Sequence, residues 1–74
     1  MDIEDVPISG GMIRLGQLLK YVGLAESGSH AAQIVASGDV SVSGEPETRR
    51  GRQLLRGDVV MVSLPEGMRG FRIA

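Results

Sequence analysis

The spacing of apolar residues changes once along this chain, and that change constrains the fold more than any other feature. In the first half the spacing is helical. Four apolar residues fall at the i, i+3, i+4, i+7 positions of one helix face: Leu15, Leu18, Leu19 and Val22. This pattern predicts a helix over residues 14–22, which Gly23 ends in the usual C-terminal manner.

A second helix is expected four or five residues later. Ser27 is a suitable N-cap, because its hydroxyl can accept a hydrogen bond from a backbone N–H of the first turn. Ala31, Ile34 and Val35 form the buried stripe, and Gly38 ends the helix. Both helices are short and amphipathic, so we expect them to pack as an angled pair.

After the second helix the apolar period becomes two, which is typical of strands. Residues 39–43 alternate, and Ser43-Gly44 suits a two-residue turn with positive φ. Residues 45–48 return as a weak strand, which Pro46 confines to a sheet edge. Residues 59–62 form the most strand-like run of the chain.

The two ends of the chain complete the predicted sheet. Residues 3–8 are expected to form an edge strand that Pro7 interrupts. Residues 64–67 are expected to form a loop, and residues 68–74 a last strand with Phe71 on its inner side. The fold class is therefore α+β: two short packed helices against a small, mostly antiparallel sheet of three to five short strands, in a single domain over residues 1–74.

Charge is distributed unevenly along the chain. Residues 1–48 hold two basic and seven acidic residues, a net charge of −5, whereas residues 49–74 hold six basic and two acidic residues, a net charge of +4. Four arginines fall within eight residues: Arg49, Arg50, Arg52 and Arg56. Guanidinium groups suit bidentate contacts with phosphate, so this run predicts an anionic partner. The alternative is a solvated loop, or salt bridges to Glu45 and Glu47.

Several functional classes find no support in the sequence. Without cysteine, neither a disulfide nor a thiolate zinc site is possible, and the lone His30 makes no convincing metal site. No nucleophile–base pair is visible, so we expect no enzyme, cofactor, metal or small-molecule substrate. The acidic N-terminus and the short apolar runs predict neither a signal peptide nor a membrane span, which fits a cytoplasmic protein. Tyr21 and Phe71, the two aromatic residues, are expected in the core rather than as base-stacking platforms.

Five short motifs occur in an order that resembles a known family. They are Arg14-Leu15-Gly16-Gln17-Leu18-Leu19-Lys20, Gly23-Leu24, Ser27-Gly28-Ser29-His30-Ala31, Gly38-Asp39-Val40-Ser41-Val42-Ser43-Gly44 and Gly57-Asp58-Val59-Val60. Together they resemble the S4 (S-four) RNA-binding domain, whose core over residues 13–62 is called the αL motif. The stretch over residues 47–52 is most similar to the stand-alone bacterial YbcJ-like branch.

The resemblance implies a non-catalytic, ribosome-associated monomer that binds structured RNA, either rRNA or tRNA, on the ribosome or in an RNA-modifying complex. It implies contacts from the helix pair and the following loop. The residues expected to make them are Arg14, Lys20, Ser29, His30, Gln33, Arg49, Arg50, Arg52 and Arg56. His30 is equally well read as an exposed residue of the capping turn.

Departures from the family pattern shift the expected site towards the loop. Many members carry basic residues on the second helix where this chain has Gly28, Ala32 and Gln33. We therefore expect the arginine loop to provide most of the RNA affinity. The rival interpretation is a protein–protein adaptor that uses the same loop on an acidic partner. A ubiquitin-like sulphur carrier is disfavoured, because that chemistry needs a terminal Gly-Gly.

Overall fold

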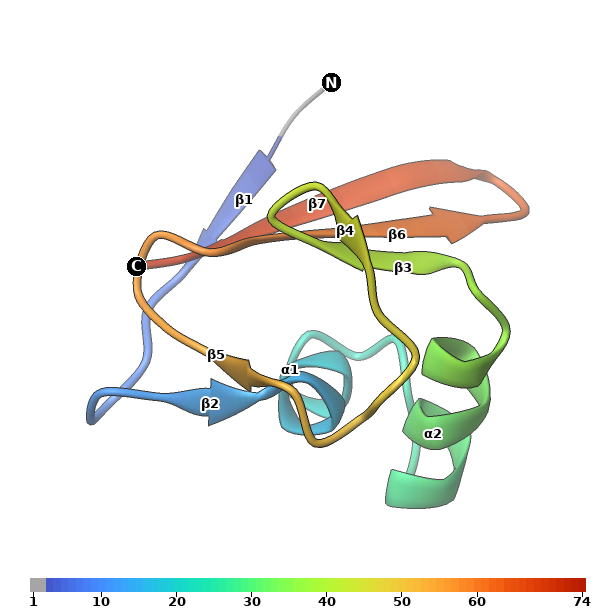
Figure 1. The fold of residues 1–74 in the computed structure, drawn as a ribbon, viewed down its shortest axis with the longest axis horizontal. Coiled ribbons are helices and arrows are strands. Elements are labelled where there is room, and N and C mark those ends of the chain that lie inside the picture. Colours follow the sequence, from blue (N-terminus) through green and yellow to red (C-terminus); the bar gives the residue numbers. More distant parts are fainter. Residues whose placement is uncertain (1–2) are drawn as a thin grey trace.

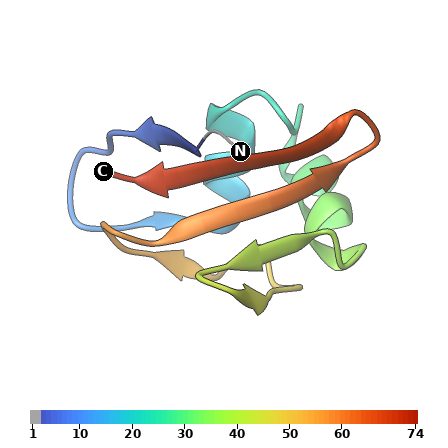
Figure 2. The same ribbon diagram turned by 90° about the horizontal axis from the view of Figure 1, so that it is seen from above.

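Two helices lie against one face of a five-stranded sheet in the computed structural model, which describes residues 3–74 (Figures 1 and 2). The elements in chain order are β1 (Ile3–Val6), β2 (Ile13–Arg14), α1 (Leu15–Tyr21), α2 (Gly28–Ala36), β3 (Val40–Val42), β4 (Glu45–Pro46), β5 (Gln53–Leu54), β6 (Val59–Leu64) and β7 (Gly67–Ile73). The predicted α+β class, with two helices and a mostly antiparallel sheet, is confirmed.

The large sheet has the strand order β1-β7-β6-β3-β4, and only the β1–β7 pair is parallel. The expected edge strands are confirmed, because β1 and β4 lie at its two edges (Figure 2). The predicted turn joins β3 to β4, with φ of 49° at Ser43 and 87° at Gly44. Two successive positive φ values match the twist of a tight hairpin.

The loop expected over residues 64–67 is shorter than predicted. Leu64 and Gly67 face each other as the last paired residues of β6 and β7, so only Pro65 and Glu66 form the turn. Gly67 has a φ of 131°, which a residue without a side chain adopts readily. β6 therefore extends two residues beyond the predicted run 59–62, and β7 begins one residue before the predicted strand.

A second, two-stranded sheet pairs β2 with β5, with Ile13 opposite Leu54 and Arg14 opposite Gln53. The sequence did not predict it, because strands of two residues carry no readable period. This small sheet determines where the arginine segment lies. It brings the arginine segment, residues 49–52, alongside the start of α1 (Figure 1).

The core lies between the large sheet and the helices. Its fully buried side chains include Leu15, Leu18 and Leu19 of α1, with Phe71 of β7. Phe71 is in the core as predicted, but Tyr21 is 67% exposed, contrary to expectation. At 100° per residue, Tyr21 is rotated by about 110° from the centre of the apolar face of α1, and this rotation turns its ring towards solvent.

Candidate nucleic-acid interface

The arginine segment packs directly on the first turn of α1, and Gly16 makes this approach possible. The Gly16 N–H donates to the Arg50 carbonyl at 2.8 Å, and the Leu15 N–H donates to the Arg52 carbonyl at 2.8 Å. A Cβ at position 16 would lie 3.3 Å from the Arg50 Cβ and 3.4 Å from its carbonyl oxygen. Sequence reasoning missed this role of Gly16, although a glycine in a first helical turn was the available signal.

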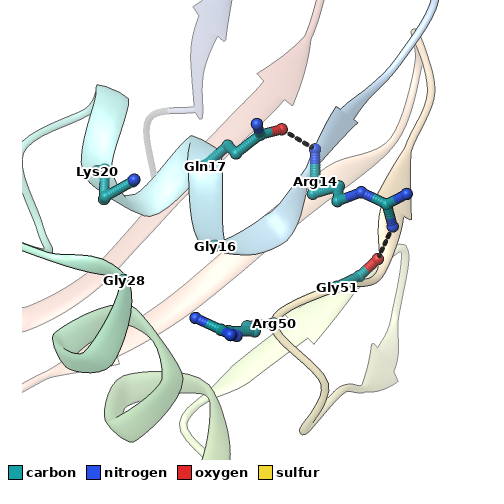
Figure 3. Close-up of a pocket in the computed structure, with 7 residues that line it drawn as sticks. All are labelled: Arg14, Gly16, Gln17, Lys20, Gly28, Arg50 and Gly51. Carbon is teal, nitrogen blue, oxygen red and sulfur yellow. Dashed lines mark hydrogen bonds between the residues drawn. The ribbon is translucent and has the colours of Figure 1, made fainter.

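A cationic pocket of about 320 Å³ forms where α1, the start of α2 and the arginine segment meet (Figure 3). We call it the cationic pocket; it is lined by Arg14, Gly16, Gln17, Lys20, Gly28, Arg50 and Gly51. Three of these seven residues carry a positive charge, and no lining residue is acidic. Such a site attracts an anion without an internal carboxylate competing for its cations.

Two contacts hold Arg14 at the rim of the cationic pocket. Its backbone N–H donates to Gln17 Oε1 at 3.0 Å, and its Nη1 donates to the Gly51 carbonyl at 2.9 Å (Figure 3). Within residues 3–74, neither Arg50 nor Lys20 forms an ion pair. Both cations are therefore available to an external anion, while Arg14 is partly fixed in advance.

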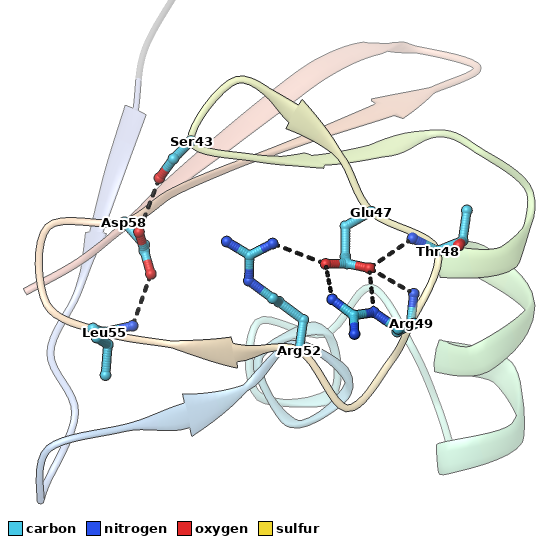
Figure 4. Close-up of polar contacts among 7 residues, drawn as sticks. All are labelled: Ser43, Glu47, Thr48, Arg49, Arg52, Leu55 and Asp58. Atoms are coloured by element: carbon cyan, nitrogen blue, oxygen red, sulfur yellow. Dashed lines mark hydrogen bonds and ion pairs between the residues drawn. The ribbon is translucent and has the colours of Figure 1, made fainter.

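A buried carboxylate organises the rest of the arginine segment. Glu47 is only 5% exposed, and its Oε2 accepts hydrogen bonds from the backbone N–H groups of Thr48 and Arg49, both at 3.1 Å (Figure 4). The side chains of Arg49 and Arg52 donate to it at 3.1 and 2.9 Å. Hydrogen bonds from Arg49, and secondly from Arg52, lower the pKa of Glu47 from 4.5 to about 2.

The arginine run thus divides into one pair that shares Glu47 and two arginines with separate surroundings. The alternative that the sequence left open, pairing with a nearby glutamate, holds for Arg49 and Arg52 with Glu47. Arg50 instead lines the cationic pocket. Arg56 lies beyond β5, where its Nη2 donates to the Ile8 carbonyl at 3.0 Å. A run that is continuous in sequence therefore does not form one continuous surface.

The expected contact residues of α2 lie outside the lining of the cationic pocket, to which this helix contributes Gly28. Ser29 and Gln33 are exposed. His30 is half-buried, and its Nδ1 accepts a hydrogen bond from the Glu26 N–H at 3.1 Å. His30 therefore belongs to the capping turn, in which its own N–H donates to Ser27 Oγ at 3.1 Å, the N-cap that the sequence predicted.

The part of the chain that the structure describes contains neither a metal-binding cluster nor a membrane-spanning helix. Residues 3–74 contain no group of three or more His, Cys, Asp or Glu side chains placed to hold a metal ion. Over the same residues, no helix has the length and apolar character needed to cross a membrane.

Comparison with known proteins identifies the family. An S4 domain model matches residues 6–67. The chain is 40% identical over 68 residues to a Bacillus subtilis protein named probable ribosome maturation protein RlbA, and the match covers 92% of each chain. It is 33% identical over 60 residues to the tyrosine–tRNA ligase of Burkholderia lata, covering 81% of this chain but 14% of the ligase. The resemblance drawn from the sequence motifs is confirmed, and this chain belongs to the S4 domain family.

Proposed function

We propose that this protein is a non-catalytic module that binds structured RNA, most specifically rRNA in the setting of ribosome maturation. Family membership and the name of its Bacillus subtilis relative support this assignment. The match to part of a tRNA ligase is consistent with an RNA ligand as well. We further propose that it acts in the cytoplasm as a monomeric single domain.

The observation that carries the proposal is the cationic pocket. Arg14 and Lys20 come from the two ends of α1 and Arg50 from the arginine segment, and the three converge on the cationic pocket without an acidic neighbour in the lining. RNA presents a regular row of phosphates, and neutralising each one releases a condensed counterion. A pocket with three cations and few aromatic groups suits the phosphate backbone of folded RNA.

The expected contributions of the arginines differ. Arg50 has no competing carboxylate and acts as the principal phosphate ligand, with Lys20 and Arg14 on either side. Arg49 can still contact RNA, because 75% of its side chain is exposed despite the pair with Glu47. Arg52, with 28% of its side chain exposed, acts mainly by holding the loop in shape. The loop and α1 therefore both contribute to RNA affinity.

Filter binding to a structured rRNA fragment tests this proposal. With three phosphates neutralised, affinity is expected to fall about 40-fold between 50 and 200 mM salt. Arg50→Gln and Lys20→Gln should each weaken binding and make the salt slope shallower by about one unit. The matched control is Arg72→Gln, because Arg72 lies on β7 and pairs with Asp5 at 3.2 Å, away from the cationic pocket.

Two results would contradict the proposal. One is salt-independent binding, or no binding even at low salt. The other is equal loss of affinity in Arg50→Gln and Arg72→Gln, which would point to non-specific charge attraction. Pull-down with and without nuclease separates RNA binding from the adaptor function: partners that survive nuclease treatment, and that Arg50→Gln releases, favour an acidic protein partner.

A further inference from the structure

The exposed face of α1 lies between two pockets. The second pocket is separate from the cationic pocket, in which the proposed function places the RNA phosphates. We call it the tyrosine pocket; its volume is about 270 Å³, and its lining is Pro7, Ile8, Ser9, Met12, Ile13 and Tyr21. Tyr21 and Met12 are 67% and 38% exposed, respectively. The walls are largely apolar and include one aromatic ring, and the Ser9 hydroxyl is a polar group among them.

The tyrosine pocket adjoins the cationic pocket through α1. Gln17, Lys20 and Tyr21 form the exposed face of this helix. Around the helix axis, Gln17 falls between the other two, at about 60° from Lys20 and about 40° from Tyr21. Because Gln17 and Lys20 line the cationic pocket, a ligand chain leaving that pocket across Gln17 reaches the Tyr21 ring next.

Arg56 places a further cation next to the tyrosine pocket. Arg56 Nη2 donates to the carbonyl of Ile8, which is one of the lining residues. Two cations therefore lie near the tyrosine pocket: Lys20 on the exposed face of α1, and Arg56 bonded to the lining residue Ile8. A largely apolar pocket with cations nearby matches a nucleotide, whose base is planar and whose two flanking phosphates are negative.

We propose that the tyrosine pocket takes one unpaired nucleobase of the RNA that the cationic pocket holds by its backbone. The proposal rests on the proposed function and adds a base-dependent contact to it. The pocket volume lies just below the usual range for small-ligand sites, about 300–1,000 Å³. A site of this size suits a single ring system rather than a larger ligand. Tyr21 stacks on the base, and Arg56 contacts the adjoining phosphate. The protein then prefers RNA helices that contain an unpaired nucleotide.

Tyr21 reports directly on this contact. It is the one tyrosine of the chain, which has no tryptophan, so intrinsic fluorescence arises from this ring. The probes are a hairpin RNA with a single unpaired adenosine and the same hairpin with an abasic residue at that position. The adenosine hairpin should quench the tyrosine emission and bind about 5- to 100-fold more tightly than the abasic hairpin, the range expected for one stacked base.

Variants separate base stacking from backbone binding. Tyr21→Ala should abolish the preference for the adenosine hairpin and leave affinity for the abasic hairpin unchanged. Tyr21→Phe should keep the preference, because the ring rather than the hydroxyl stacks. Since Tyr21 is exposed, neither variant removes a core side chain.

Three outcomes overturn the inference. Equal affinity of the wild-type protein for both hairpins, or equal quenching by both, excludes a base contact at Tyr21. Retention of the preference in Tyr21→Ala places the base elsewhere. In these cases the proposed function stands if Arg50→Gln still weakens binding to both hairpins. Failure to bind either hairpin at low salt overturns the proposed function as well.

Discussion

Among single residues, Glu47 has the largest effect on the arginine segment. Its carboxylate accepts five hydrogen bonds from Thr48, Arg49 and Arg52. A buried carboxylate without such partners would be costly, whereas a fully satisfied one fixes the groups that surround it. Glu47 thereby holds the backbone just before Arg50 and the side chain of Arg52 just after it, while the Gly16 N–H bonds the Arg50 carbonyl. The carboxylate that pairs with Arg49 and Arg52 also fixes the segment that carries Arg50.

Glu47 should make the free energy of unfolding depend on pH in the acidic range. Its pKa is lowered from 4.5 to about 2 on folding, so its contribution is fully present above the unfolded value of 4.5 and is lost as pH falls towards 2. We expect Glu47→Gln to lower the free energy of unfolding near neutral pH, and the difference from wild type to shrink through this window. Urea denaturation across the pH range measures it. Glu45→Gln, an exposed substitution in the same segment, should show no such dependence.

Gly16 should matter more for binding than for stability. Alanine at position 16 improves helix propensity by up to about 1 kcal/mol, but its Cβ presses on Arg50. We expect Gly16→Ala to change the free energy of unfolding by less than about 1 kcal/mol, and Gly16→Val to displace the loop and weaken RNA binding clearly. Filter binding and urea denaturation measure both effects. Gly11→Ala is the control, because a Cβ at Gly11 meets nothing within 4 Å; an equal loss of affinity there would refute a specific role for Gly16.

The arginine run illustrates how far residue types alone can be read. The sequence showed the positive charge of the run and its proximity to Glu47. It also left pairing with a glutamate open as an alternative. The sequence did not show that Glu47 is buried. The prediction that Tyr21 lies in the core was wrong. This aromatic residue lies next to the apolar face of α1 and was assumed to belong to it.

At the level of elements, α2 depends on its N-cap. Ser27 Oγ accepts the His30 N–H at 3.1 Å, and no acidic residue lies in the first turn. We expect Ser27→Ala to lower the free energy of unfolding by about 1 kcal/mol. Ser29→Ala, an exposed change two residues further along, should leave it within about 0.5 kcal/mol. Chemical denaturation with circular dichroism compares the two, and equal losses would show that the Ser27 hydrogen bond contributes little.

Elements with a clear period were predicted well. Both helices, the β3–β4 hairpin and the β6 and β7 strands follow from apolar spacing and turn residues that act over a few neighbours. The β2–β5 pair and the parallel β1–β7 pair were not predicted, because they join segments about 40 and 67 residues apart. The candidate site depends on the first of these pairs, so the sequence located its residues without showing which of them converge.

The whole molecule should unfold as one unit. A single core connects the sheet to both helices, and we propose that the 74 residues form one domain. Calorimetry is expected to show one transition with an enthalpy of about 50 kcal/mol near 60 °C, equal to the van't Hoff value. Light scattering should give a monomer mass at the same time. Two transitions would mean that the small sheet and helices unfold apart from the large sheet.

The parallel β1–β7 pair also determines how the molecule bears mechanical load. Ile3 lies beside Gly70 and Val6 beside Ile73, so the outer ends of the two strands are at opposite ends of the pair. Tension applied between residues 3 and 73 slides one strand along the other and loads their hydrogen bonds together rather than one at a time. The chain should therefore resist stretching through its ends, and the rupture of a single edge pair should precede any disturbance of the cationic pocket.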